Sequence, residues 1–153
     1  HGAVITDFAD FDDVEFLKKS YNIFFVEDKI NAVGNDILAN DRVALIHPDF
    51  DSKTAKIIGD ILNVEVVKGE IGGIKTVGSV AVVTKKAMLV HPNVSDDEIK
   101  YLQDLFKVPV HVATANFGSL FLGASMIANS KGAYVGDLST PVETMHIEEV
   151  LDL

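Results

Sequence analysis

The feature of this sequence that most constrains its fold is an internal repeat of 44 to 45 residues. Three apolar segments align on a shared glycine, since Gly34, Gly78 and Gly123 are 44 and 45 residues apart. The alignment continues downstream, where Val43-Ala44-Leu45-Ile46-His47-Pro48 matches Ala87-Met88-Leu89-Val90-His91-Pro92 at an offset of 44 residues. Several separate segments that share one offset indicate a structural repeat.

Each repeat unit contains the signals for four elements in a fixed order. In the unit that begins near residue 30, we expect a strand over 33–39, a polar hairpin turn at Asn40-Asp41 and a second strand over 42–46. The second strand ends at His47-Pro48, because proline cannot donate a hydrogen bond to a neighbouring strand. A helix and a third strand over 64–68 follow. The unit is therefore predicted to be strand–strand–helix–strand.

The helices in the later units have clear start signals. Ser95-Asp96-Asp97-Glu98 and Thr140-Pro141-Val142-Glu143 both fit a capping box, in which a hydroxyl and a carboxylate bind each other's free backbone N–H groups. The helix near 95–107 has one apolar stripe, formed by Ile99, Leu102, Leu105 and Phe106. The acidic cluster Asp10, Asp12, Asp13 and Glu15 is also expected to open a helix, where carboxylates favour the positive end of the helix dipole.

The repeat predicts an incomplete unit at each end of the chain. Gly2-Ala3-Val4-Ile5 aligns with 43–46, so the chain opens at a second strand, and the last unit stops where a third strand should begin. We expect one domain made of a partial repeat (1–29), two repeats (30–73 and 74–117) and a last repeat (118–153) without its closing strand. A closed ring would take that strand from the start of a longer polypeptide, with roughly 70 further residues.

Composition and charge limit the classes of function. The chain is 48% hydrophobic, and no stretch is long enough for a membrane span, which favours a single soluble, cytoplasmic domain. The start at His1 carries no basic region typical of a signal peptide. The net charge of −10 disfavours a primary role in binding nucleic acid, although a basic protein on a ribonucleoprotein would suit it. With no cysteine, disulfides, thiolate metal sites and cysteine nucleophiles are impossible.

Candidate catalytic, metal and nucleotide motifs are weak. His47 and His91 are repeat-equivalent, but neither has a histidine four residues away, so we favour a role as strand-end caps over metal binding. No Gly-x-Ser-x-Gly elbow is present, and neither 69–73 nor Gly118-Ser119 leads into a phosphate-binding helix. The acidic cluster at 10–15 lacks the glycine that a calcium loop needs. We predict no catalytic residue, no metal and no cofactor.

Polar residues near the repeat glycines have two interpretations. These residues are Asn35, Ser79, Thr114, Asn116 and Ser119. Because they stand at the entry to apolar segments, they could simply cap the backbone there. Alternatively, equivalent positions gathered at one end of a ring would form a polar contact face.

Several of these segments resemble the translation initiation factor 6 family. The matching segments are Ala32-Val33-Gly34-Asn35-Asp36-Ile37-Leu38-Ala39-Asn40-Asp41, 44–49, Thr76-Val77-Gly78-Ser79, 89–92, Thr114-Ala115-Asn116-Phe117-Gly118-Ser119 and 126–133. The resemblance extends from the second unit to the end of the chain. Since the chain ends directly after the last predicted helix, at Asp152-Leu153, it is similar to the archaeal type. The family's first unit has no counterpart here, so contacts made by that unit have no residues in this chain.

The resemblance implies a fold, a partner and a contact face. The fold would be α/β (α+β), a pentein-type propeller of pseudo-symmetric strand–strand–helix–strand repeats around a central axis. The protein would be a monomer that binds the large ribosomal subunit near a ribosomal protein of the L14 family, with rRNA nearby, and sterically blocks joining of the small subunit. A role in large-subunit biogenesis is also implied. Gly34 and Asn35 match a position associated with subunit binding, and we extend this expectation to Ser79, Asn116, Gly118 and Ser119.

Two other classes of function are alternatives to this one. Enzymes that modify guanidino groups resemble the same fold, but they attack through a cysteine that this chain does not contain. A non-catalytic module that binds another protein or a ligand is the second alternative. Co-sedimentation with large ribosomal subunits separates that module from an anti-association factor.

Overall fold

The computed structural model describes residues 2–153; His1 lies outside the described residues. The strands are β1 (Gly2–Thr6), β2 (Asn22–Val26), β3 (Ile37–Ala39), β4 (Val43–Ile46), β5 (Glu65–Lys68), β6 (Ala81–Val83), β7 (Met88–Val90), β8 (Val110–Val112), β9 (Met126–Asn129) and β10 (Gly132–Val135). The helices are α1 (Phe11–Val14), the 3-10 helix η1 (Glu15–Lys19), α2 (Val33–Asp36), α3 (Ser52–Leu62), α4 (Val77–Val80), α5 (Asp96–Phe106), α6 (Leu122–Ser125) and α7 (Pro141–Leu151). The protein is therefore a mixed α/β fold.

Two three-stranded sheets have the same topology. Their strand orders are β3-β4-β5 and β6-β7-β8, and in each the first pair is antiparallel and the second pair is parallel. Helix α3 connects β4 to β5, and α5 connects β7 to β8, starting 44 residues later. The chain also has two smaller sheets, a parallel β1-β2 pair and an antiparallel β10-β9 pair. The 44-residue offset in the sequence is therefore also the offset between equivalent structural elements.

The segment expected to be a strand over 33–39 is only partly a strand. Residues Val33–Asp36 form one helical turn, α2, and the strand β3 begins at Ile37. The same substitution of a helical turn for the start of a strand occurs at α4 and α6. The expected strand extended the apolar residues 37–39 back to Val33, but a helical turn forms there instead, and the equivalent turns α4 and α6 place Gly78 and Gly123 against the backbone of the preceding unit. The prediction for these residues was therefore wrong.

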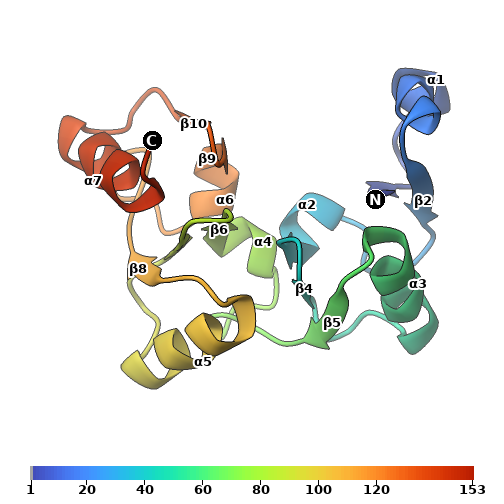
Figure 1. Ribbon diagram of the computed structural model, residues 1–153, viewed down its shortest axis with the longest axis horizontal. Coiled ribbons are helices and arrows are strands. Elements are labelled where there is room, and N and C mark those ends of the chain that lie inside the picture. The colour runs from blue at the N-terminus through green and yellow to red at the C-terminus, as the bar shows by residue number, and fades with distance from the viewer. Residues whose placement is uncertain (1) are drawn as a thin grey trace.

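The short helices α2, α4 and α6 lie side by side in the middle of the molecule, whereas α3, α5 and α7 lie at its periphery (Figure 1). A β-carbon added to Gly78 would overlap the carbonyl oxygen of Gly34, and one added to Gly123 would overlap the carbonyl oxygen of Gly78. A β-carbon on Gly34, by contrast, would have no atom within 4 Å. Glycine is thus required where one unit packs on the backbone of the one before it.

The core fills the space between the sheets and the peripheral helices. Leu102 and Phe106 on α5 are fully buried, and the partly buried Ile99 and Leu105 pack against the same cluster. This cluster also contains Leu38, Leu45, Val80 and Val90, so it joins the sheet β3-β4-β5 to the sheet β6-β7-β8. Burial of each large apolar side chain contributes about 1.5–3 kcal/mol. The apolar stripe predicted for the helix near 95–107 is confirmed.

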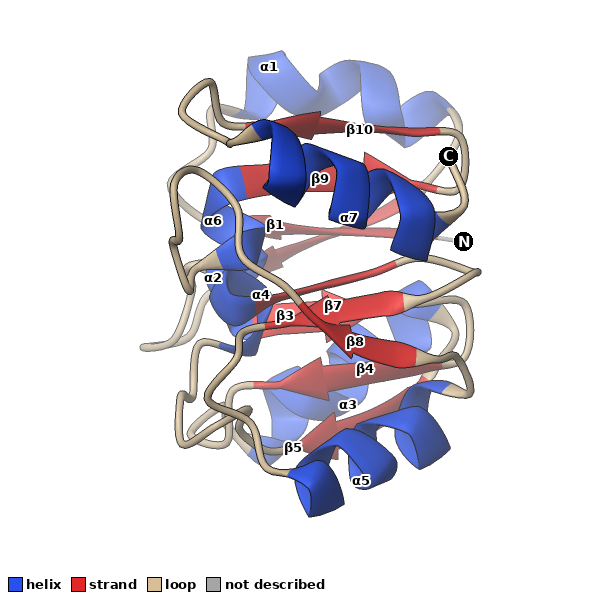
Figure 2. Cartoon of the chain, turned by 90° about the vertical axis from the view of Figure 1, so that its left-hand side faces the viewer, coloured by secondary structure: helices blue, strands red, loops and turns tan. Residues whose placement is uncertain are grey.

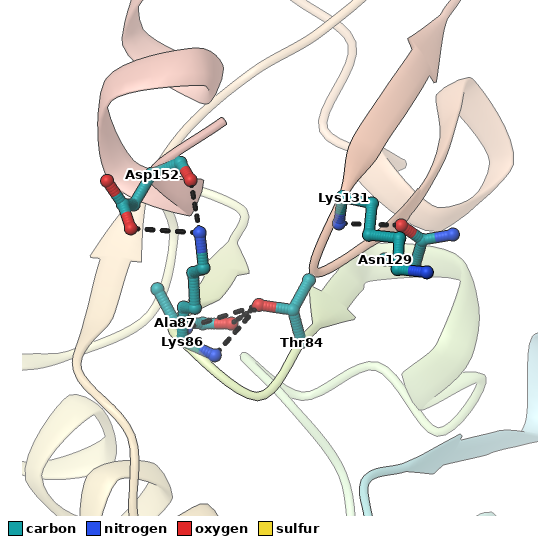
Figure 3. A network of polar contacts seen from close by, with 6 residues as sticks. All are labelled: Thr84, Lys86, Ala87, Asn129, Lys131 and Asp152. Atoms are coloured by element: carbon teal, nitrogen blue, oxygen red, sulfur yellow. Dashed lines mark hydrogen bonds and ion pairs between the residues drawn. The ribbon is translucent and has the colours of Figure 1, made fainter.

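The hairpin turns between the first and second strands of each unit lie at the opposite end of the molecule from the short helices (Figure 2). In each turn, a side-chain oxygen accepts a hydrogen bond from the backbone N–H two residues later. Asn40 Oδ1 accepts from the N–H of Arg42 (2.9 Å), Thr84 Oγ1 from the N–H of Lys86 (3.1 Å) and Asn129 Oδ1 from the N–H of Lys131 (2.8 Å). Figure 3 shows the second and third of these turns, together with the ion pair between Lys86 and Asp152 (2.8 Å). We call this end of the molecule the hairpin end.

Candidate functional site

The predicted site residues lie at the end of the molecule opposite the hairpins, which is the left-hand end in Figure 2. We call it the glycine end; it comprises α2, α4, α6 and the loop 114–119, which leads from β8 towards α6. Gly34 and Asn35 are exposed on α2, where the N–H of Asn35 donates to the carbonyl of Ala32 (2.7 Å). These two residues are accessible to a partner.

Ser79 is not accessible in the same way, although it follows the equivalent glycine. Its side chain is 6% exposed, and its hydroxyl donates to the carbonyl oxygen of Thr76 (2.6 Å). The Oγ atoms of Thr76 and Ser79 are also within hydrogen-bond distance of each other (2.9 Å). The hydroxyl is therefore used within its own helical turn rather than presented to solvent.

Asn116, Gly118 and Ser119 lie in one loop with unusual backbone geometry. Asn116, Phe117 and Gly118 have positive φ angles of 53°, 65° and 83°. The loop closes on itself, since the N–H of Ser119 donates to the carbonyl of Ala115 (2.8 Å). Left-handed conformations are costly for residues other than glycine, so such a loop persists only where the surroundings hold it in place.

The segment before α7 provides part of that support. The N–H of Asn116 donates to the hydroxyl of Ser139 (2.8 Å), and Asn116 Oδ1 accepts from the N–H of Leu138 (3.2 Å). The backbone N–H and the side-chain oxygen of Asn116 are therefore both engaged within the protein. Phe117 and Gly118 are the exposed residues of this loop, and Phe117 has 78% of its surface exposed.

Glu143, near the start of α7, holds the loop most directly. Its Oε1 accepts from the N–H of Gly118 (2.8 Å) and the hydroxyl of Thr114 (2.8 Å), and its Oε2 accepts from the N–H of Phe117 (3.2 Å). Oε2 also accepts from both the N–H (2.8 Å) and the hydroxyl (3.0 Å) of Thr140, which completes the predicted capping box. Burial raises the pKa of Glu143, but these hydrogen bonds outweigh it and lower the pKa to about 2.

The same connection between a helix start and a loop recurs in the preceding units. Glu98, which is equivalent to Glu143, accepts from the N–H of Gly72 (2.6 Å), another residue with positive φ. Its carboxylate is therefore directed to the loop, and only the Ser95 half of the predicted capping box is observed there. In the unit before that, the loop carries the carboxylate and the helix start supplies the donor: the loop residue Asp28 accepts from the N–H of Asp51 (3.1 Å). We call these three connections the carboxylate clasps.

Sequence reasoning missed the clasps. Glu143 was recognised only as the partner of Thr140, because a capping box is a local pattern. The contact with Gly118 spans 25 residues and has no local signature. The equivalence of Glu98 and Glu143 in the repeat was the available signal.

The two repeat-equivalent histidines act as backbone caps. His47 Nδ1 accepts from the N–H of Asp49 (3.1 Å), and His91 Nδ1 accepts from the N–H of Asn93 (3.3 Å). Among residues 2–153, no group of three or more His, Asp or Glu side chains is arranged to hold a metal ion. An open hollow of about 530 Å³ is lined by Arg42, Lys56, Asp60 and Glu65 among others, and contains no predicted site residue.

Comparison with known proteins identifies the family. The model of the eIF-6 family matches residues 1–150. The chain belongs to the eIF-6 family. Translation initiation factor 6 of Thermoplasma acidophilum is 48% identical over 151 residues, which cover 99% of this chain and 67% of that protein. The factors of Picrophilus torridus and Pyrococcus abyssi are 54% and 46% identical over 85% and 92% of this chain.

This eIF-6 family chain spans about two thirds of the length of these archaeal relatives, with 60% and 65% of the Picrophilus torridus and Pyrococcus abyssi proteins covered. The sequence resemblance to the translation initiation factor 6 family is thus confirmed. In the part of the chain that the structure describes, no helix is both long and apolar enough to cross a membrane.

Proposed function

We propose that the protein is a ribosome anti-association factor, which binds the large ribosomal subunit and sterically blocks joining of the small subunit. The observation that carries this proposal is the family match over residues 1–150, together with archaeal relatives that are named translation initiation factor 6. A role in large-subunit biogenesis belongs to the same proposal. The protein would work in the cytoplasm as a monomer.

The proposed architecture is a pentein-type ring of five pseudo-symmetric units, of which this chain contributes the partial unit 1–29, the units 30–73 and 74–117, and the last unit 118–153. Two features support it: the identical topology of the two three-stranded sheets, and the packing of Gly78 and Gly123 on the unit before each of them. A ring would also pair the open edges of the β1-β2 and β10-β9 sheets, which avoids exposed strand edges.

The glycine end is the proposed contact face. Steric obstruction needs a rigid surface rather than a reactive group, and the carboxylate clasps fix the loops at this end. We propose Gly34 and Asn35 as direct contacts, because both are exposed there. Gly118 is exposed as well and would add a contact, whereas Ser79, Asn116 and Ser119, which are buried or half-buried, would contribute mainly by shaping the face. The net charge of −10 favours a basic ribosomal protein, such as one of the L14 family, over bare rRNA as the principal partner.

Sedimentation with purified archaeal ribosomal subunits tests this function. We expect the protein to migrate with the large subunit in a sucrose gradient at physiological salt, and to reduce the yield of joined ribosomes when small subunits are added. The substitution Asn35→Ala should weaken binding about tenfold, which corresponds to about 1.4 kcal/mol. Lys56→Ala on the peripheral helix α3 is the control and should bind normally. If the protein stays at the top of the gradient, the proposed function is wrong.

A further inference from the structure

The last unit carries large apolar side chains on its outer surface. The exposed fractions are 78% for Phe117, 64% for Leu138, 71% for Val142 and 62% for Met145. These residues surround the Glu143 clasp: Phe117 donates its N–H to Glu143, Leu138 donates its N–H to Asn116, and Val142 precedes Glu143 in the chain. Met145 lies one turn after Val142 on the same side of α7. We call these four residues the apolar patch.

The equivalent positions in the two preceding units are not apolar. Counting back by 45 and then by 44 residues, Val142 corresponds to Asp97 and Lys53, Met145 to Lys100 and Lys56, Leu138 to Asn93 and Asp49, and Phe117 to Gly72 and Asp28. The fold therefore does not require apolar side chains at these positions. Helix α7 nevertheless keeps the inward-facing residues that a core helix needs, since Ile147 and Leu151 are 2% and 0% exposed.

Packing of neighbouring units does not account for the patch either. Helix α5 belongs to a unit that has another unit on each side, yet Asn93, Asp97 and Lys100 remain exposed there. Positions on the outward side of a peripheral helix thus stay in contact with solvent when both neighbours are present. A group of large exposed apolar side chains at such positions is typical of a binding site for another molecule.

The charges around the patch indicate what kind of molecule binds there. Residues 137–153 contain Asp137, Glu143, Glu148 and Glu149, as well as Asp152, which forms an ion pair with Lys86, but they contain no lysine or arginine. A phosphate backbone would be repelled by these carboxylates, whereas a protein segment with apolar side chains among lysines and arginines complements both properties of the surface. Because Glu143 already holds the loop that presents Phe117, little conformational entropy remains to be lost on binding.

We infer that the apolar patch is a docking surface for a basic protein segment whose apolar side chains cover Phe117, Leu138, Val142 and Met145. The inference rests on the proposed function, since it takes that segment to belong to a protein of the large ribosomal subunit. It extends the contact region from the glycine end, to which the loop residue Phe117 belongs, over the outer side of the last unit. Aromatic and methionine side chains in the centre of an interface contribute a large share of its binding energy.

A substitution that copies α5 onto α7 tests this inference. In the double variant Val142→Asp and Met145→Lys, α7 carries the residues that α5 has at the equivalent positions. Since both side chains are mostly exposed, the variant should fold with an unchanged melting temperature, and its affinity for large subunits should fall at least tenfold. The matched control, Lys53→Ala with Lys56→Ala on α3, should bind as the unsubstituted protein does.

Photo-crosslinking identifies the chemistry of the partner. A benzoylphenylalanine introduced in place of Met145 should crosslink to a lysine- and arginine-rich ribosomal protein, whereas the same group in place of Lys100 should not. Crosslinks from position 145 to rRNA, or an unchanged affinity of the double variant, would overturn the inference while leaving the proposed function intact. If the unsubstituted protein fails to bind large subunits at all, the proposed function is wrong and the inference falls with it.

Discussion

Replacement of Glu143 by glutamine tests the structural role of the carboxylate clasp. Both carboxylate oxygens accept from backbone N–H groups: Oε1 from Gly118, and Oε2 from Phe117 and Thr140. A glutamine side chain has one NH₂ group, so either orientation of the amide places that donor against at least one backbone donor. The variant therefore loses hydrogen bonds and leaves an N–H group without an acceptor.

The magnitude follows from the pKa of Glu143. A fall from 4.5 to about 2 corresponds to about 3 kcal/mol of preferential stabilisation of the charged form. The side chain is only half-buried, and solvent screening reduces this value to about 2 kcal/mol. We expect Glu143→Gln to lower the free energy of unfolding by about that amount at pH 7.

The pKa of Glu143 also determines in which direction its contribution to stability changes with pH. Because folding lowers the pKa of Glu143, its contribution is fully present above the unfolded value of 4.5 and is lost as the pH falls towards 2. The difference in stability between the unsubstituted protein and Glu143→Gln should therefore shrink between pH 5 and pH 2. Urea unfolding followed by circular dichroism, repeated across this range, measures that difference.

Glu98→Gln is the matched control, because Glu98 makes a single contact of this kind with Gly72. Its cost should be smaller, about 1 kcal/mol. Amide hydrogen exchange at Phe117 and Gly118 should accelerate in Glu143→Gln and remain unchanged in Glu98→Gln. Equal stability of Glu143→Gln and the unsubstituted protein at pH 7, or a difference that does not vary with pH, would refute this account of the clasp.

Two further predictions concern the packing of the units and the hairpin turns. Gly78→Ala should lower the free energy of unfolding by about 3 kcal/mol or more, since the added methyl group overlaps the carbonyl of Gly34. Gly34→Ala has room for the methyl group and should be nearly neutral. Similar losses of stability in both variants would contradict this prediction. Asn40→Ala should cost about 1–2 kcal/mol, because Asn40 holds its own turn and donates to the carbonyl of Phe106 (2.9 Å). Asp41→Ala removes only a solvent-exposed ion pair with Lys85 and should leave the urea midpoint unchanged.

Much of the fold could be predicted from the sequence, because the repeat supplies the same local signals several times. The helices at 96–106 and 141–151 begin where their capping residues predict, and the second and third strands of the unit 30–73 lie within one residue of the expected bounds. The start of the first strand could not be predicted from periodicity. Residues 33–36 were predicted to belong to the same strand as the apolar residues 37–39, whereas they form the helical turn α2, which packs against α4 of the next unit, a contact without a local signature.

The candidate site was predictable in position but less so in detail. The residues that follow the repeat glycines do gather at one end of the molecule, and Asn35 is exposed there. Nothing in the sequence distinguished Asn35 from Ser79, whose hydroxyl is used within its own helical turn. Phe117 was quoted in the family resemblance without a role, because its exposure depends on a loop that residues 136–143 hold from a distance.

The contact between successive glycines has a consequence for how this architecture can change. The distance between adjacent units is set by main-chain atoms, which are the same whatever side chains the outer helices carry. A unit can therefore exchange the charged side chains of its outward surface for apolar ones, as α7 does relative to α3 and α5, without altering how it joins its neighbours. The outward surface can therefore change one unit at a time, while the main-chain contact between neighbouring units stays the same.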